Sequence, residues 1–287
     1  MSALSMAALW MIGAIASFSS MAVAGREVAI ELDTFEIMMF RSLLGVVVVV
    51  LVAGMTGTWR QINTQNMGLH AARNLAHFTG QNLWFFAVTV IPLAQVFALE
   101  FTSPLWVIVL SPLVLGEKLT PMRALAAIMG FIGILIIARP GVTAVDMGVI
   151  TAAACAIFFA LSIMFTKRLT RTQSITCILF YLTTMQLVFG LIAAGYDGDI
   201  KIPTSATVPF VLVIGIAGLL GHFCITKALA LAPATVVMPI DFIRLPAIAV
   251  IGMLLYNEPL DLWVGVGAAI IFIGNYLNIW SETRRKA

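Results

Sequence analysis

Long apolar stretches alternate with short polar or turn-rich segments along the whole chain. The stretches run near residues 3–24, 34–53, 68–90, 92–115, 121–138, 145–166, 174–195, 207–229, 233–255 and 260–280. Most approach the roughly 20 apolar residues that an α-helix needs to cross a bilayer. The strands of a membrane β-barrel would instead be about 10 residues long and would alternate in polarity, which this sequence does not do. The pattern therefore predicts an all-α membrane protein with ten transmembrane helices.

The composition argues against a soluble protein. Hydrophobic residues make up 61% of the 287 residues, and charged residues only 10%. A soluble domain usually has about 25% charged residues, which cover its surface. Ten helices of roughly 20 residues also use most of the chain. Short connections remain, and we expect no separate soluble domain.

Charged residues between the apolar stretches are distributed unevenly. If the N-terminus is cytoplasmic, nine basic residues fall on the inner side and three on the outer side. The inner set is Arg60, Lys118, Arg123, Lys167, Arg168, Arg171, Arg284, Arg285 and Lys286, and the outer set is Arg26, Arg139 and Lys201. Because cytoplasmic loops are enriched in Lys and Arg, we expect a multi-pass protein of the cell inner (cytoplasmic) membrane with both termini cytoplasmic. This topology explains the basic C-terminal tail without any binding to nucleic acid.

The two halves of the chain align without a gap when the sequence is shifted by 141 residues. Glycine, proline and acidic positions coincide in this frame. The matched pairs include Gly80 with Gly221, Pro92 with Pro233, and Glu100 with Asp241. The predicted repeats are residues 1–141 and 142–287, with five helices each. Because five is odd, the second repeat enters the membrane from the opposite side, an arrangement typical of secondary transporters.

Several short motifs are spread along both halves of the chain. They are Phe35-Glu36 and Phe40-Arg41, Ile91-Pro92-Leu93-Ala94, Phe101-Thr102-Ser103-Pro104-Leu105, Gly116-Glu117 with Gly130 and Gly133, Ala232-Pro233-Ala234, and Asn257-Glu258 with Gly274. On these motifs the whole chain resembles the EamA branch of the drug/metabolite transporter superfamily, although Asn257 stands where the family usually has glycine. The resemblance implies alternating-access transport of a small organic metabolite, with uptake of riboflavin or S-adenosylmethionine as examples. Efflux of amino acids, metabolites or drugs by the same fold is the alternative.

Two acidic residues are predicted at membrane depth, where a charge is costly and marks a functional site by default. Glu100 and Asp241 each lie eight residues past a proline that opens a helix, or about 12 Å into a core about 30 Å thick. Arg244 lies three residues after Asp241, and Ser103 bears the same relation to Glu100. We expect Asp241–Arg244 to be a structural pair, and Glu100 to borrow a cation such as Arg73 or to hold a proton. Ion pairing between helices, without substrate contact, is the alternative for both carboxylates.

The third apolar stretch carries a polar stripe. Its members are His70, Arg73, His77, Gln81 and Trp84. They recur at steps of three or four residues, which places them on one face of a helix. Arginines at membrane depth suit a carboxylate, a phosphate or polar carbonyls, and aromatic residues suit a ring. The expected substrate-binding set is Arg41, Arg73, His77, Gln81, Trp84, Glu100, Ser103, His222, Asp241 and Arg244.

Neither a metal site nor a cofactor is expected. The histidines of the stripe have no cysteine or carboxylate spaced to complete a metal site, and Cys155, Cys177 and Cys224 fall singly in predicted helices. No G-x-x-x-x-G-K-[ST] run is present, so we expect gradient-driven or facilitative transport. An enzyme would need a nucleophile–base or metal constellation, and a channel would pass larger currents. The expected partners are a small-molecule substrate and the lipid bilayer; transport direction, coupling ion and oligomeric state stay open, with a homodimer as one option.

Overall fold

A computed structural model describes residues 3–114, 120–139, 146–231, 240–241 and 243–286. This part of the chain contains helices and no strands. The motifs Gly116-Glu117 and Ala232-Pro233-Ala234 lie outside the described residues, as does the predicted boundary between residues 141 and 142.

The helices follow one another with short connections. They are α1 (Ala3–Val28), α2 (Thr34–Thr56), the 3₁₀-helix η1 (Thr58–Gln61), α3 (Met67–Val90), α4 (Leu93–Glu100), α5 (Ser103–Val114), α6 (Pro121–Ala138), α7 (Met147–Leu169), α8 (Ile175–Ala194), α9 (Val208–Leu231), α11 (Arg244–Tyr256) and α12 (Leu262–Lys286). Seven spans in the described part are long and apolar enough to cross a membrane, and α11 and α12 add shorter apolar segments. The predicted all-helical, multi-pass class is therefore confirmed. Helix α3 has 24 residues but is not among the seven, because its polar face lowers its hydropathy.

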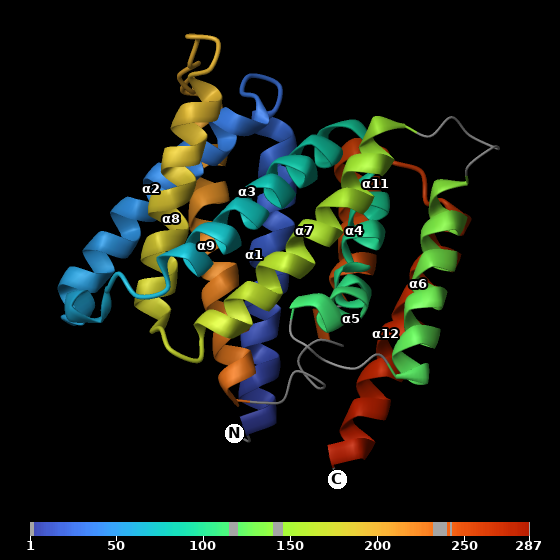
Figure 1. Ribbon diagram of the computed structural model, residues 1–287. Coiled ribbons are helices and arrows are strands. Elements are labelled where there is room, and N and C mark those ends of the chain that lie inside the picture. The colour runs from blue at the N-terminus through green and yellow to red at the C-terminus, as the bar shows by residue number, and fades with distance from the viewer. Residues whose placement is uncertain (1–2, 115–119, 140–145, 232–239, 242, 287) are drawn as a thin grey trace.

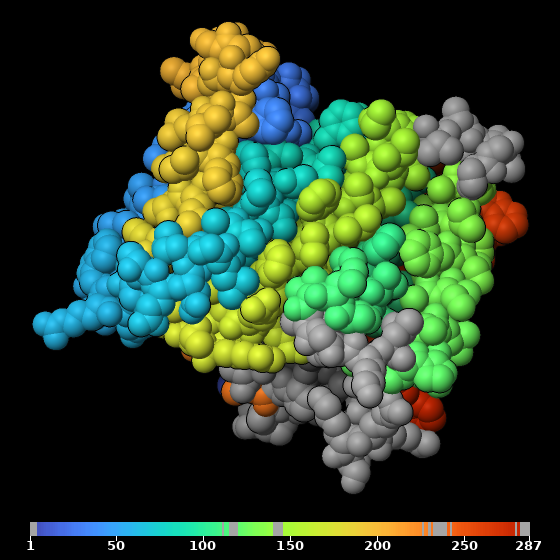
Figure 2. Space-filling model, in the orientation of Figure 1, coloured from blue at the N-terminus to red at the C-terminus, as the bar shows by residue number. Residues whose placement is uncertain are grey.

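Helix pairs that join the two halves of the chain dominate the packing. Helix α1 packs on α9, α3 on α7, α2 on α8, α6 on α12, and α4 on α11. Exchanging the halves turns the α1–α9 pair into the α3–α7 pair and leaves the α2–α8 and α6–α12 pairs unchanged. Figure 1 shows α2 and α8 side by side at one edge, α6 and α12 at the other, and both chain ends at the same end of the bundle. In Figure 2, α3 and α7 run together across the visible face.

The fourth apolar stretch is not one continuous helix. It divides into α4, which ends at Glu100, and α5, which begins at Ser103. Pro104 explains the break, because a proline ring has no N–H and clashes with the carbonyl four residues earlier, here that of Glu100. The amide of Asn275 on α12 donates to the carbonyl of Phe101 at 3.1 Å and satisfies one main-chain group that the break exposes. The expectation of an unbroken helix over 92–115 was therefore wrong.

The ninth apolar stretch is also divided at its acidic residue. Ile240 and Asp241 are helical, and α11 begins at Arg244. In the described part, a turn at Ile243 separates the carboxylate from the start of α11, whereas residues 232–239 and 242 lie outside the described residues. Interrupted helices at membrane depth occur where the backbone is buried in protein or lines a cavity, so both breaks direct attention to this region.

One arginine ties several segments together at the end of the bundle away from the chain termini. Arg26, in the last turn of α1, donates to the carbonyls of Val88 and Ile91, each at 2.6 Å, and forms an ion pair with Glu258. The second carboxylate oxygen of Glu258 accepts from the main-chain N–H of Leu93 at 2.9 Å, which caps α4. The α3–α4 and α11–α12 connections are therefore held to α1 at this end.

A second set of contacts joins the α1–α2 and α8–α9 connections at the same end. Glu31 accepts from the Thr207 hydroxyl at 2.6 Å and from the Thr204 main-chain N–H at 2.9 Å. The Thr207 hydrogen bond is the main reason that the pKa of Glu31 lies below its ordinary value. Glu36 accepts from the Lys201 main-chain N–H at 2.6 Å while it also completes the capping box of α2.

Close backbone contact between α6 and α12 requires glycine on both helices. A Cβ atom on Gly133 would lie 2.8 Å from the Gly267 carbonyl oxygen, and one on Gly267 would lie 2.7 Å from that of Gly133. Small residues at such positions let membrane helices approach and gain van der Waals contact.

We predict that Gly133→Leu separates α6 from α12 and destabilises the protein by about 1–3 kcal/mol through overpacking. Thermal unfolding of the detergent-purified variant measures this loss. Gly265→Leu is the matched control on α12, because a Cβ atom there would meet nothing within 4 Å. Equal unfolding temperatures for the two variants would contradict the glycine contact.

Candidate functional site

One arginine joins the two acidic residues that the sequence places at membrane depth. Nη2 of Arg244 donates to Oε1 of Glu100 at 3.2 Å and to Oδ2 of Asp241 at 3.0 Å. The indole N–H of Trp84 donates to the other Glu100 oxygen at 2.8 Å. Asp241 is 6% exposed and Arg244 5% exposed, so the charges interact with little screening by solvent. These residues form the central charge cluster, defined as Trp84, Glu100, Asp241 and Arg244.

The partners within this cluster differ from those expected. Arg73 is not the cation of Glu100, because Arg244 fills that role. Asp241–Arg244 is likewise not an isolated pair, since the same nitrogen serves both carboxylates. The hydroxyl of Ser103 donates to the main-chain oxygen of Glu100 at 2.6 Å, and so supports the break between α4 and α5.

Three aromatic rings surround the shared guanidinium. Cζ of Arg244 lies 5.0 Å from the ring centres of Phe97 and Phe101 and 5.3 Å from that of Phe18. Aromatic faces attract a cation, and they do so more strongly when water is excluded. Sequence reasoning did not assign Phe18 or Phe97 to the site. Phe18 aligns with Phe159 in the 141-residue frame, and this match was a signal that could have identified it. Phe97 stands in an apolar run, where nothing in the sequence sets it apart.

A second group of polar side chains lies deeper between α2, α3, α8 and α9, and we call it the basic cluster. Its members are Arg41, Arg73, His77, Gln186 and His222. The imidazole rings of His77 and His222 are 5.7 Å apart. A cavity of about 20 Å³ is lined by Arg41, Gln186 and His222 among others. The sequence named four of these five residues, whereas Gln186 was missed although it is a polar residue in an apolar helix.

Neutral groups surround the two arginines of the basic cluster. Nε of Arg73 donates to the Thr166 hydroxyl at 3.1 Å, and Nη1 donates to the side-chain oxygen of Asn74 at 2.8 Å. Nη1 of Arg41 lies 3.5 Å from the sulfur of Met38. Among the described residues, no carboxylate forms an ion pair with either guanidinium.

The remaining stripe residues of α3 take different places. Gln81 is buried on the face that it shares with His77 and Trp84. His70 is fully buried, and its ring lies 4.7 Å from that of Tyr181. The stripe is therefore an inward-facing surface along the whole of α3, and it contributes to both clusters.

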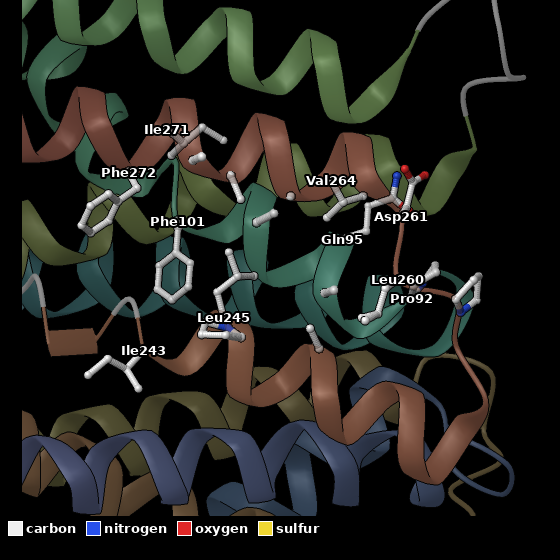
Figure 3. Close-up of a pocket in the computed structure, with 18 of the residues that line it drawn as sticks. Pro92, Gln95, Phe101, Ile243, Leu245, Leu260, Asp261, Val264, Ile271 and Phe272 are labelled. Carbon is white, nitrogen blue, oxygen red and sulfur yellow. The ribbon is translucent and has the colours of Figure 1, made fainter.

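A cavity lies beside the central charge cluster. It has a volume of about 630 Å³ between α4, α11 and α12, which is in the range of metabolite-binding pockets. Figure 3 shows Phe101 and Leu245 projecting toward it. Its lining is mostly apolar, with Gln95 and the Arg139–Asp261 ion pair as polar exceptions. Phe101 also contacts Arg244 and thus separates the cavity from the charges.

We identify the candidate site with the two charged clusters rather than with this cavity. Buried charges in a membrane are costly and mark functional positions, whereas an apolar recess between helices is also a place for lipid. In the described part of the chain, no group of three or more His, Cys, Asp or Glu residues is placed to hold a metal ion.

Comparison with known proteins agrees with this architecture. The model of the EamA-like transporter family matches residues 5–139 and again residues 146–280. The chain belongs to the EamA-like transporter family. Its two EamA units match a riboflavin transporter of Vibrio cholerae serotype O1 at 28% identity over 284 residues, covering 97% of this chain and 94% of the relative. An S-adenosylmethionine uptake transporter of Rickettsia bellii is 24% identical over 275 residues, covering 96% and 94%.

The EamA fold is also seen in a solved structure. A protein of known crystal structure superposes with a TM-score of 0.66 over 99% of each chain, at 18% sequence identity. At this identity the similarity establishes the fold alone. As an EamA-like transporter with multiple membrane-length apolar helices, the protein is a multi-pass membrane protein that transports a small molecule.

We predict that Arg244→Gln destabilises the EamA-like transporter by about 3–5 kcal/mol, because it leaves Glu100 and Asp241 buried without their cation. Folded yield and thermal unfolding in detergent measure the effect. Arg171→Gln removes an exposed charge and serves as control. An Arg244→Gln protein as stable as this control would show that the central charge cluster does not hold the fold together.

Proposed function

We propose that this EamA-like transporter takes up a vitamin or nucleoside-like metabolite, such as riboflavin or S-adenosylmethionine, by alternating access. The observation that carries the proposal is Glu100 at an interrupted helix, bonded to Trp84 and to an arginine from the other half of the chain. Relatives named for riboflavin and S-adenosylmethionine transport support the choice of substrates. Uptake is secondary active or facilitative.

The proposed architecture is ten transmembrane helices in two inverted five-helix repeats. The pairing of α1 with α9 and of α3 with α7, which exchange under exchange of the halves, supports this arrangement. Inverted repeats place the substrate at their interface near the middle of the membrane. Glu100 comes from the first half and Arg244 from the second, so rocking of one repeat against the other would change the contact between them.

The proposed substrate-binding residues are the ten that the sequence singled out. The basic residues would bind acidic or carbonyl groups, and Trp84 together with the phenylalanines around Arg244 would contact a ring. In this structure the Ser103 hydroxyl is occupied, because it donates to the main-chain oxygen of Glu100 at the break between α4 and α5. Rotation of α5 relative to α4 would free its hydroxyl for a ligand.

The substrate is tested in liposomes that contain the purified protein. We expect labelled riboflavin or S-adenosylmethionine to accumulate by counterflow when the same unlabelled compound is inside. Protein-free liposomes are the control. Counterflow of neither compound, with counterflow of amino acids instead, would favour the efflux alternative. Unsaturable flux without counterflow would indicate a channel.

Glu100 is the proposed site of proton coupling. The charged and titratable groups that interact with it are Arg244, Asp241 and Cys155 of α7. Glu100→Gln preserves shape but removes the exchangeable charge, so we expect loss of any dependence on a pH gradient while counterflow survives. Asp241→Asn should instead lower folded yield, since it weakens the charge-assisted hydrogen bond that Arg244 donates to Oδ2 of Asp241 at 3.0 Å. Gradient-driven uptake retained in Glu100→Gln would rule out this role.

The proposed topology places both termini in the cytoplasm of a bacterial cell. Arg171 lies in the α7–α8 connection and Asp199 in the α8–α9 connection, and both are exposed. We expect an impermeant thiol reagent, added to intact cells, to label Asp199→Cys but not Arg171→Cys. Cys155, Cys177 and Cys224 are buried and give a low background. The reverse labelling pattern would invert the topology.

A further inference from the structure

The basic cluster contains two buried cations that have no counter-charge among the described residues. Arg41 is 8% exposed and Arg73 5% exposed. Their hydrogen-bond partners are a sulfur, a hydroxyl and an amide oxygen, all neutral. An unpaired charge inside a membrane protein is strongly unfavourable, so this arrangement weakens the ligand-free protein.

Charges of the opposite sign are present in the protein but are placed elsewhere. When both carboxylates are ionised, Glu100 and Asp241 share Arg244 and the central charge cluster has one negative charge in excess. Pairing one of these carboxylates with Arg41 or Arg73 would have neutralised the central charge cluster and left one unpaired cation in the basic cluster instead of two. The fold instead keeps these carboxylates and arginines in separate clusters. This separation is expected of a site in which a ligand supplies the neutralising negative charge.

Other side chains of the basic cluster also favour binding of an anion. Nε2 of Gln186 and Nε2 of His77 are buried and have no hydrogen-bond partner among the described residues. Gly218 leaves room for the guanidinium of Arg41, because a Cβ atom there would lie 2.9 Å from its Nε and 3.1 Å from Nη2. Arg41 and Gln186 thus line the small cavity together with His222, and His77 of α3 lies next to it through its ring contact with His222.

We infer that Arg41 and Arg73, with His77 and Gln186, form a subsite that binds a carboxylate or phosphate group of the substrate. The inference rests on the proposed function, and of its two example substrates it favours S-adenosylmethionine, which carries a carboxylate, over riboflavin, which has neither anionic group. Guanidinium groups bind both anions through paired, charge-assisted hydrogen bonds. The cavity of about 20 Å³ holds no more than a water molecule, so α2, α8 and α9 must separate to admit the anion.

The two clusters together select a dipolar substrate. The ring of Phe18 lies 5.5 Å from that of His222 and 5.3 Å from Cζ of Arg244, so a single phenylalanine separates the two clusters. An anionic group at Arg41 and Arg73 would place the other end of a metabolite near the excess negative charge of the central charge cluster. A cationic or donor-rich group suits that end.

The first experiment needs no knowledge of the natural substrate. Thermal unfolding of the purified transporter is measured with phosphate or citrate against chloride at constant ionic strength. We expect both anions to raise the unfolding temperature of the wild type. Arg41→Gln and Arg73→Gln should unfold at higher temperature than the wild type without ligand, and should lose the response to anions. Arg60→Gln, in exposed η1, should behave like the wild type.

Conservative variants separate binding from folding. Arg41→Lys and Arg73→Lys keep the charge and should keep part of the response to phosphate. If the glutamine variants unfold at lower temperature and still respond to anions, the two arginines are structural and the inference is wrong. If the wild type shows no response to either anion, the inference is also wrong.

The second experiment uses ligands that differ in one acidic group. We expect the wild type to bind flavin mononucleotide more tightly than riboflavin, or S-adenosylmethionine more tightly than its decarboxylated form. Tighter binding of flavin mononucleotide than of riboflavin would indicate a phosphate subsite. Tighter binding of S-adenosylmethionine than of its decarboxylated form would indicate a carboxylate subsite. Each glutamine variant should lose about tenfold or more in affinity for the acidic member, with little change for the other. If no compound of either pair binds while anions still protect only the wild type, the proposed substrates fail and the anion subsite stands.

Discussion

The sharing of one guanidinium between two carboxylates is the interaction on which the centre of this protein depends. Arg244 belongs to one half of the chain and Glu100 to the other, and both lie beside an interrupted helix. Without the arginine, two acidic groups would face each other in a region of low dielectric, where like charges repel strongly. The aromatic rings around Arg244 exclude water and thereby strengthen the same attraction. The interface of the two repeats is thus held by charge where most of the bundle is held by apolar packing.

The helices around this centre pack closely at the edge of the bundle, and the helical segment that carries Glu100 is interrupted at the candidate site. Gly133 and Gly267 bring α6 and α12 into backbone contact at one edge. Near the centre, Pro104 ends α4 at Glu100, and Asn275 satisfies the carbonyl that follows. An interrupted helix costs backbone hydrogen bonds, so such a break persists only where other groups replace them. Here those groups come from α12 and from Ser103, which couples the supporting helices to the candidate site.

Much of this organisation is predictable from the sequence, because the length of the apolar stretches and the 141-residue repeat are visible in the order of the residues. The polar face of α3 and the acidic positions Glu100 and Asp241 were found in the same way. The break after Glu100 was missed although Pro104 is visible, because prolines are tolerated in many membrane helices. The partner of Glu100 could not be predicted, since Arg244 is 144 positions away and only the tertiary fold brings them together. Gln186 and Asn275 were overlooked as single polar residues, whose direction a sequence does not give.

The contacts of Arg26 have a consequence for how the molecule moves. Three segments distant in sequence are joined through this one side chain, which binds Val88, Ile91 and Glu258 together. α1 cannot move away from the α3–α4 or α11–α12 connection without releasing this partly buried cation from its acceptors. A separation that breaks one of these contacts removes support from the others. We therefore expect opening at that end to separate the three segments together rather than one at a time.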